Sequence, residues 1–204
     1  EEVDLDIDSI DFRHTNWISF AIKWAELKAL VIENKKVQYK EKIFDQGEKI
    51  NNHFENWLRK HYASIINLPP SPPAMLHHIP RYLSRIIEGN EINKIALIVI
   101  DGLSLDQWMT VKSIIQSQNN KFSFSETAAF AWVPTLTSVS RQSIFSGKLP
   151  MYFPSSIYSS NYEKKLWSQF WQKRGYSKYE IAYKRGLGDG NIKSILDEVI
   201  IESQ

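Results

Sequence analysis

The sequence contains no cysteine. That absence excludes disulfide bonds, thiolate metal ligands and a cysteine nucleophile, and it is typical of proteins of the reducing cytoplasm, where we expect this one. Long apolar runs are also lacking: a run such as residues 95–100 is far too short to cross a bilayer, so we expect no membrane partner. Charge of one sign is not in excess either, because 25 Lys and Arg stand against 23 Asp and Glu, and the net charge of +2 gives no bulk argument for nucleic acid.

Aromatic residues, by contrast, are frequent. They make up 13% of the 204 residues and include seven tryptophans. We interpret them as large apolar anchors in a core or at an interface, in preference to surfaces on which bases stack. A chain of this length with 43% hydrophobic residues can bury a sizeable core.

The first third of the sequence has the periodicity of two helices. Apolar residues recur at intervals of three and four from Thr15, a candidate N-cap, to Val31, and again from Tyr39 to Ile65. The joint between them, residues 34–36, is short, so we predict an antiparallel helix pair. Residues 1–12 alternate acidic and apolar side chains, and we assign no structure to them.

A proline cluster at residues 68–73, "LPPSPP", is the best candidate for a domain boundary, because it cannot continue a helix. A short helix that ends near Gly89 is expected after it, with Pro80 at or near its start. The predicted domains are therefore a helical region at 1–67, a connector with a short helix at 68–93, and an α/β part at 94–204.

The second half alternates strand-like and helix-like segments. The strands are expected at 95–100, within 122–133 and at 178–183, and the helices at 104–116 after Ser104 as the cap, from just after Thr137, at 163–174 and at 191–201. The run "KIALIVI" is typical of a strand buried on both faces of a parallel sheet. We predict an α/β fold: a mainly parallel sheet flanked by helices, preceded by an α-helical N-terminal region.

Asp101 directly follows the predicted strand at 95–100 and precedes Gly102. Ligands of open α/β sheets bind at the carboxyl ends of strands, and a carboxylate there is a common ligand of hard metal ions. Asp before Gly is also common turn chemistry. Both interpretations of Asp101 stay open on these residues alone.

The stretch "PTLTSVSRQSIFSG", residues 134–147, concentrates hydroxyl groups where a strand should give way to a helix. Thr137 falls at or next to the helix N-terminus, where backbone N–H groups and the helix dipole favour a phosphate or an ionised hydroxyl. In the alternative interpretation Thr137 or Ser138 is simply an N-cap. Arg141, about one turn further along, shifts the balance modestly toward phosphate, because a guanidinium can fork onto phosphate oxygens and a cap needs no arginine.

The segments "IVIDG" and "PTLTSVSRQSIFSGKLP" together resemble the opening of the alkaline phosphatase superfamily. The second is similar in spacing to the phosphodiesterase pattern P-T-x-T-x-P-N and to the sulfatase pattern C-x-P-S-R. Both place the nucleophile at Thr137 rather than Thr135, and both have proline where this sequence has Val139. With "MLHHIPRYL" and "EKKLWSQFW" in the same order, residues 75 to 175 resemble the PglZ domain of bacterial phage-resistance (BREX) systems.

The resemblance implies a metal-dependent phosphatase or phosphodiesterase. Asp101 and Thr137 would ligate one divalent metal, zinc by preference, and Thr137 would attack phosphorus to give a covalent phosphothreonine. Arg141 and Ser140 would bind the phosphate. The implied partners are other phage-defence components and a nucleic-acid or nucleotide substrate. The alternative is a non-catalytic interaction module of the same defence assembly, in which the superfamily core serves as a scaffold.

The further metal ligands that the superfamily supplies after its nucleophile are missing from this sequence. No histidine follows Thr137, and the aspartates that do are Asp189 and Asp197. We therefore expect the remaining ligands beyond Gln204, and expect this fragment to be metal-free or weakly loaded and nearly inactive. His77 and His78 are expected to pack or hydrogen-bond, because adjacent helical residues point about 100° apart and cannot easily chelate one ion.

Overall fold

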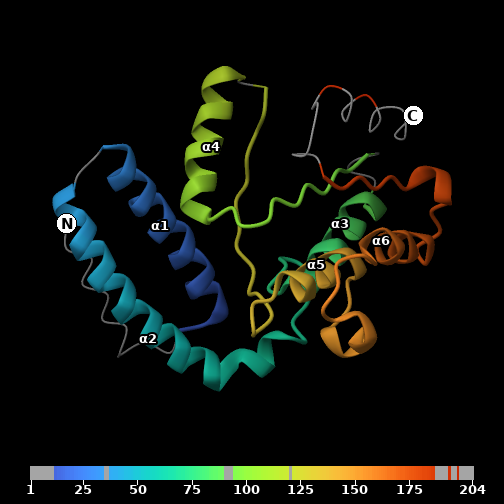
Figure 1. Ribbon diagram of the computed structural model, residues 1–204, viewed down its shortest axis with the longest axis horizontal. Helices are drawn as coiled ribbons and strands as arrows, with labels where there is room; N and C mark the ends of the chain where they lie inside the picture. Colours follow the sequence, from blue (N-terminus) through green and yellow to red (C-terminus); the bar gives the residue numbers. More distant parts are fainter. Residues whose placement is uncertain are drawn as a thin grey trace. The chain divides into compact units, whose positions relative to one another are not determined.

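The computed structural model describes residues 12–34, 37–89, 94–119 and 121–186, together with Lys193 and Asp197 (Figure 1). The chain divides into two compact units, each built from two separate stretches. Unit 1 comprises residues 1–68 and 97–129, and unit 2 comprises residues 69–96 and 130–204. We describe each unit by itself, and the predicted domain limits at 67/68 and 93/94 stay predictions.

The predicted α/β fold is wrong. The described residues form an all-α structure with six helices and no sheet, and the backbone pairing outside helices is a single isolated bridge between Met75 and Phe130. Residues 94–100 form neither helix nor strand, and the side chains of Ile98 and Ile100 are 70% and 59% exposed.

The physical reason for this error is that a strand exists only through its neighbours. An apolar, β-branched run favours an extended backbone, but a sheet also needs a second strand to accept and donate the ladder hydrogen bonds. Residues 122–129 likewise form no strand, and the predicted strand at 178–183 begins as the short 3-10 helix η5, Lys178–Glu180. The prediction that the apolar run forms a strand buried on both faces is therefore wrong.

Unit 1 contains the helices α1 (His14–Glu33), α2 (Lys40–Ile65) and α4 (Leu105–Gln118), with the 3-10 turn η1 (Val37–Tyr39) before α2. Helix α1 packs against both α2 and α4, so the predicted pairing of the first two helices is confirmed. The N-cap of α1 is Arg13 rather than Thr15, and the backbone N–H of Arg13 donates to the side chain of Asn16 at 2.9 Å. The predicted cap of α4 at Ser104 is confirmed.

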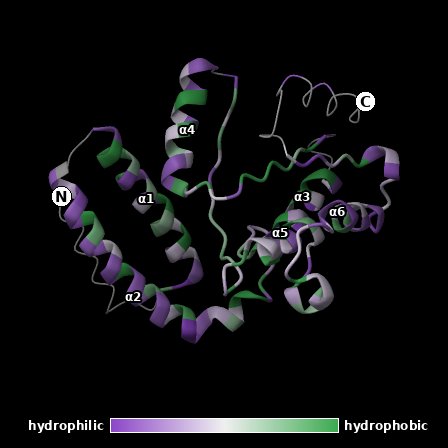
Figure 2. Cartoon of the chain, in the orientation of Figure 1, coloured by the Kyte–Doolittle hydropathy of each residue, from purple (hydrophilic) through white to green (hydrophobic). Residues whose placement is uncertain are grey.

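The core of unit 1 is aromatic. The indole of Trp17 is 6% exposed and lies against four other rings, with centroid separations of 4.9 to 6.1 Å, from Phe12, Phe20, Phe54 and Trp57. Apolar and polar residues are mixed along α1 and α2 (Figure 2). The interpretation of the tryptophans as core anchors is therefore confirmed for Trp17.

Unit 2 is organised around α5 (Thr137–Ser146). This helix packs against α6 (Glu163–Gln172), α3 (Ile79–Glu88) and the 3-10 turn η2 (Leu76–His78), and the turns η3 (Pro150–Tyr152) and η4 (Pro154–Ser156) follow it. The predicted short helix that ends near Gly89 and the predicted helix after Thr137 are confirmed, and so is the helix predicted at 163–174, which ends at Gln172. The predicted helix at 191–201 lies outside the described residues except for Lys193 and Asp197, which are both helical.

The core of unit 2 also uses tryptophan, and it includes both adjacent histidines. Trp132, Trp167 and Trp171 are 4–8% exposed, and His77 and His78 are each 1% exposed. The Nδ1 atom of His78 accepts the backbone N–H groups of Ala74 and Met75 at 3.3 and 3.2 Å, and the ring of His77 lies 5.3 Å from that of Trp132. The predicted packing and hydrogen-bonding role of the two histidines is confirmed.

Candidate functional site

The hydroxyl-rich stretch forms the start of α5. Pro134 follows a cis peptide bond, Leu136 is the N-cap with an extended backbone, and Thr137 is the first helical residue, as predicted. The backbone N–H of Ser140 donates to the carbonyl of Leu136 at 2.9 Å, which leaves the amides of the first turn before it at the positive end of the helix. No side chain caps α5, so the interpretation of Thr137 or Ser138 as an N-cap is wrong.

The side chain of Thr137 is exposed. The part of the chain that the structure describes supplies no hydrogen-bond partner for its hydroxyl. Thr137 therefore places a solvent-accessible hydroxyl at a helix N-terminus, which is the arrangement that a nucleophile acting on an anionic substrate requires.

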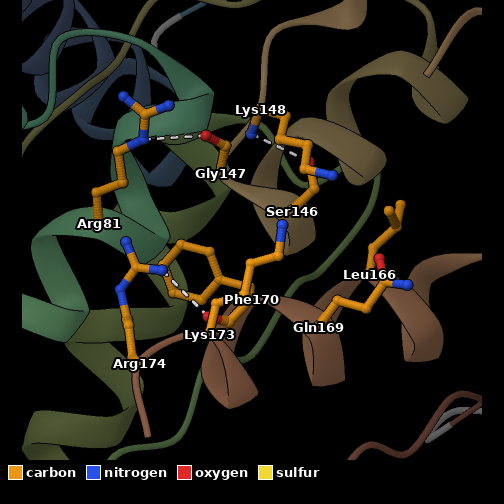
Figure 3. A pocket seen from close by; sticks show the side chains of 9 residues that line it. All are labelled: Arg81, Ser146, Gly147, Lys148, Leu166, Gln169, Phe170, Lys173 and Arg174. Carbon is orange, nitrogen blue, oxygen red and sulfur yellow. Dashed lines mark hydrogen bonds between the residues drawn. The ribbon is translucent and has the colours of Figure 1, made fainter. Parts of the chain in front are cut away.

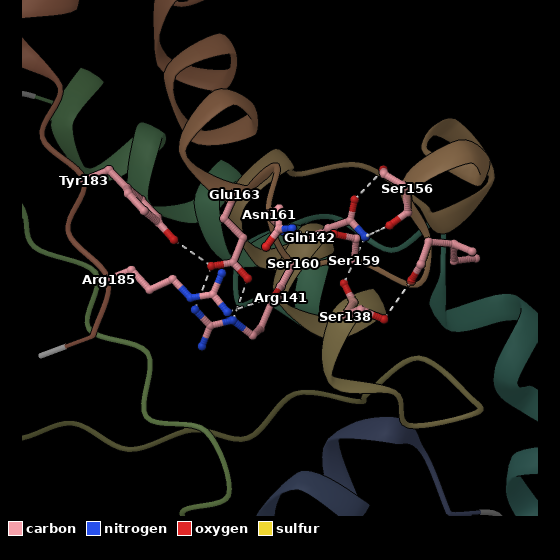
Figure 4. Close-up of polar contacts among 11 residues, drawn as sticks. Ser138, Arg141, Gln142, Ser156, Ser159, Ser160, Asn161, Glu163, Tyr183 and Arg185 are labelled. Atoms are coloured by element: carbon pink, nitrogen blue, oxygen red, sulfur yellow. Dashed lines mark hydrogen bonds and ion pairs between the residues drawn. The ribbon is translucent and has the colours of Figure 1, made fainter. Parts of the chain in front are cut away.

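The neighbouring hydroxyl of Ser138 is used in a hydrogen bond that stabilises the fold (Figure 4). It donates to the carbonyl of Ile157 at 2.7 Å. One turn further, the fully buried amide of Gln142 donates to the carbonyl of Ser156 at 2.8 Å and accepts the hydroxyl of Ser156 at 2.6 Å. These bonds fix the segment after α5 against one side of that helix, and the half-buried Ser140 lies on the same helix between Ser138 and Gln142.

Arg141 is held by a carboxylate that the sequence interpretation missed. Its Nε and Nη2 atoms donate to the Oε1 and Oε2 atoms of Glu163, both at 2.6 Å, and Glu163 is 0% exposed. The hydroxyl of Tyr183 donates to Oε2 of the same carboxylate at 2.7 Å. Glu163 is also the first residue of α6, where the helix dipole favours a negative charge.

This environment changes the titration of the phenol. Burial raises the pKa of Tyr183 to about 12, and the hydrogen bond to Glu163 and its negative charge act in the same direction, while the charges of Arg141 and Arg185 act against them. The phenol therefore stays protonated as a donor to Glu163 over the whole physiological range.

The sequence contained a signal for this pair. No Asp or Glu occurs between Glu126 and Glu163, so Glu163 is the first carboxylate after Arg141, and it opens a predicted helix. A half-buried arginine near a helix N-terminus needs a counter-charge, and Glu163 is the nearest carboxylate downstream. The role of Arg141 in phosphate binding stays a prediction.

Asp101 lies in an exposed turn, and Gly102 beside it has φ +75, a conformation that suits glycine. Asp101 belongs to unit 1, whereas Thr137, Ser140 and Arg141 belong to unit 2. The structure thus brings the last three together on one helix, and the predicted metal ligation by Asp101 and Thr137 stays a prediction.

A divalent metal does not fit the described residues by themselves. Among them no group of three or more His, Asp or Glu side chains converges in a way that could hold a metal ion. A stable site needs about four ligands. The described helices also include none that is both long and apolar enough to span a membrane.

Residues 80–201 match the family model of the BREX system PglZ alkaline phosphatase-like domain. This range covers more than half of the 204 residues and contains all four predicted site residues. The chain belongs to the PglZ family. For this PglZ chain, comparisons with curated proteins and with solved structures gave no match.

Proposed function

We propose that this PglZ chain carries the nucleophile of a phosphatase or phosphodiesterase of a phage-defence (BREX) system, and that the nucleophile is Thr137. The observation that supports this most is the exposed Thr137 hydroxyl at the first position of α5, inside the region that matches an alkaline phosphatase-like family. The amides of the first helical turn point toward the space an anion would occupy.

In the proposed reaction, the Oγ1 atom of Thr137 forms a bond to phosphorus as its proton leaves. The bond from phosphorus to the departing oxygen breaks, and that oxygen takes up a proton. Water then cleaves the bond between phosphorus and Thr137, which restores the hydroxyl and releases phosphate from a monoester substrate or the remaining phosphate monoester from a diester. The amides at the start of α5 orient the phosphate and stabilise the negative charge that gathers on its oxygens.

The family implies a metal in its relatives, and Asp101 is the residue of this sequence that the superfamily pattern assigns to it. Because the described residues do not assemble a metal site, we derive no step through a metal. The substrate class we propose is nucleic acid or a nucleotide, and the partners are other components of the defence system.

The test is hydrolysis of bis(4-nitrophenyl) phosphate by the complete gene product, with zinc or manganese added. Thr137→Ala is expected to lower the rate at least about 100-fold, because the covalent step is lost. The matched control is Thr135→Ala, since Thr135 is also an exposed threonine of the same stretch and should leave the rate within about twofold. Unchanged hydrolysis by Thr137→Ala would show that the nucleophile is another group.

A second candidate function, a non-catalytic interaction module, is favoured by the state of Arg141. The Nε and Nη2 atoms of Arg141 already donate to the carboxylate of Glu163, so they are not available to a phosphate while this ion pair is formed. If the complete gene product shows no hydrolysis of phosphate mono- or diesters with any divalent metal, and still assembles with the other defence components, this module is the correct function.

A further inference from the structure

A pocket of about 160 Å³ opens at the far end of α5 from Thr137 (Figure 3). It lies within unit 2, between α3, the C-terminal end of α5 and α6. Nine residues line it: Arg81, Ser146, Gly147, Lys148, Leu166, Gln169, Phe170, Lys173 and Arg174. Thr137 and Ser146 are the first and last residues of the same helix, which at 1.5 Å per residue places them about 13 Å apart along the axis.

The charge of this basic pocket is unbalanced. Four of the lining residues are cationic and none is acidic. Arg81 donates its Nε to the carbonyl of Gly147 at 3.0 Å, and Arg174 donates its Nε to the hydroxyl of Ser84 at 2.9 Å. Both arginines are thus bonded to neutral oxygen atoms.

Burial works against these charges. It lowers the pKa of Arg81, and it lowers the pKa of Arg174, which the nearby charge of Arg81 lowers further and that of Glu88 partly restores. Glu88 itself accepts the hydroxyl of Ser84 at 2.7 Å. Two guanidinium groups are therefore held near each other in a partly buried place, an arrangement that an anion between them would stabilise.

The helix C-terminus accounts for only part of this charge. Carbonyls at the end of α5 attract cations, and Arg81 satisfies one of them. The helix C-terminus does not explain the charges of Lys148 and Lys173, because within the described ranges neither ammonium group has a hydrogen-bond or ion-pair partner. The lysines add positive charge to a pocket in which the arginines already repel each other.

The aromatic ring of the pocket is already covered. The guanidinium carbon of Arg174 lies 3.7 Å from the centre of the Phe170 ring, Gly147 packs against its edge, and the side chain is 5% exposed. A base has no free ring face on which to stack here. The pocket can therefore recognise a phosphate group but not the base attached to it.

We propose that this basic pocket binds a phosphate group, with Arg81, Lys148, Lys173 and Arg174 supplying the charge. The phosphate belongs either to a small phosphorylated molecule or to the backbone of a nucleic acid. The pocket is separate from Thr137, and the proposal does not depend on catalysis there.

The test compares two double variants of the whole chain. Lys148→Gln with Lys173→Gln removes two charges of the pocket. Lys164→Gln with Lys165→Gln removes two charges from exposed positions of helix α6, outside the pocket. Among the described residues none of these four lysines has a hydrogen-bond or ion-pair partner for its ammonium group. Both double variants should therefore have the melting temperature of the parent, and a thermal melt checks this before binding is measured.

Two probes separate the sources of the phosphate. The binding of inorganic phosphate is measured by calorimetry. The binding of a fluorescent abasic oligodeoxynucleotide, which carries phosphates without bases, is measured by fluorescence anisotropy. The pocket variant is expected to bind at least one probe about tenfold more weakly than the parent, and the control variant within about twofold. Binding of the oligonucleotide alone assigns the pocket to a backbone, and binding of phosphate assigns it to a small molecule. Equal losses in both variants, or no binding of either probe to the parent, would overturn the proposal.

Discussion

Replacing Glu163 by glutamine removes the counter-charge of Arg141 while keeping the shape of the side chain. In the structure the carboxylate is 0% exposed and accepts two bonds of 2.6 Å from Arg141 and one of 2.7 Å from Tyr183. Glu163→Gln cannot accept all three bonds, and it removes the negative charge that balances Arg141, whose side chain is only 17% exposed. The pair joins α5 to α6, so the loss falls on the main packing contact of unit 2.

The magnitude follows from the burial. Removing one member of a buried ion pair costs about 3–5 kcal/mol. Because Arg141 retains some contact with solvent and the glutamine oxygen still accepts one bond, we expect the lower end, about 3 kcal/mol. With a urea m-value of about 2 kcal/mol/M, the unfolding midpoint should fall by about 1.5 M. The buried indoles of Trp167 and Trp171 on α6 report this transition by fluorescence.

The control for this prediction is Glu55→Gln. Glu55 pairs with Arg59 at the same distance of 2.6 Å, but the two side chains are 60% and 75% exposed. Water competes for such a pair, so its loss should leave the midpoint almost unchanged. A shift by Glu163→Gln no larger than the shift by Glu55→Gln would show that burial does not decide the strength of these pairs, and would refute the reasoning.

Three further predictions concern other contacts. The raised pKa of Tyr183 means that its stabilising effect is complete below pH 10 and is lost as the pH rises to about 12. The difference in phenolate absorbance between the parent and Tyr183→Phe should therefore titrate with a midpoint near pH 12, and a midpoint near 10 would contradict this. Gly147→Ala should lower stability by at least about 1 kcal/mol in a thermal melt, because φ is +63 and the new Cβ would lie 2.8 Å from the Phe170 ring; a raised melting temperature would disprove this. Burial acts to raise the pKa of Asp106, but the hydrogen bond from Lys28, with its charge and the local backbone bond, outweighs burial and holds the pKa below its ordinary value. The ionised form thus stabilises unit 1 fully above the ordinary pKa of Asp, and this stabilisation is lost as the pH falls further, through the lowered pKa of the folded state. Acid unfolding of Asp106→Asn should therefore depend less on pH, and identical profiles would contradict the assignment.

The sequence predicted the helices well because their signals are local. Ser104 as the cap of α4, the start of α5 at Thr137 and the glycine after α6 each depend on a few neighbouring residues. The predicted sheet was wrong because a strand depends on distant partners, and the exposed Ile98 shows that an apolar run alone does not supply them.

The candidate site shows the same difference between local and long-range features. The position of Thr137 at a helix N-terminus follows from a local pattern and is confirmed. The partner of Arg141 lies 22 residues away, and only the packing of α6 on α5 brings Glu163 to it. A sequence motif can indicate that an arginine suits a phosphate, but the carboxylate that occupies it is visible only once the helices have packed.

The nucleophile can be tested directly by trapping the phosphothreonine. The complete gene product is mixed with a phosphodiester and a divalent metal, quenched in acid during turnover, and digested with trypsin, which cuts after Lys121 and Arg141 and so releases residues 122–141. We predict that fragmentation of this peptide locates one phosphoryl group, still esterified to the group of the substrate that did not leave, on Thr137, and that Thr137→Ala abolishes it while Thr135→Ala does not. Product formation without phosphate on this peptide, or with phosphate on another residue, would contradict the central claim.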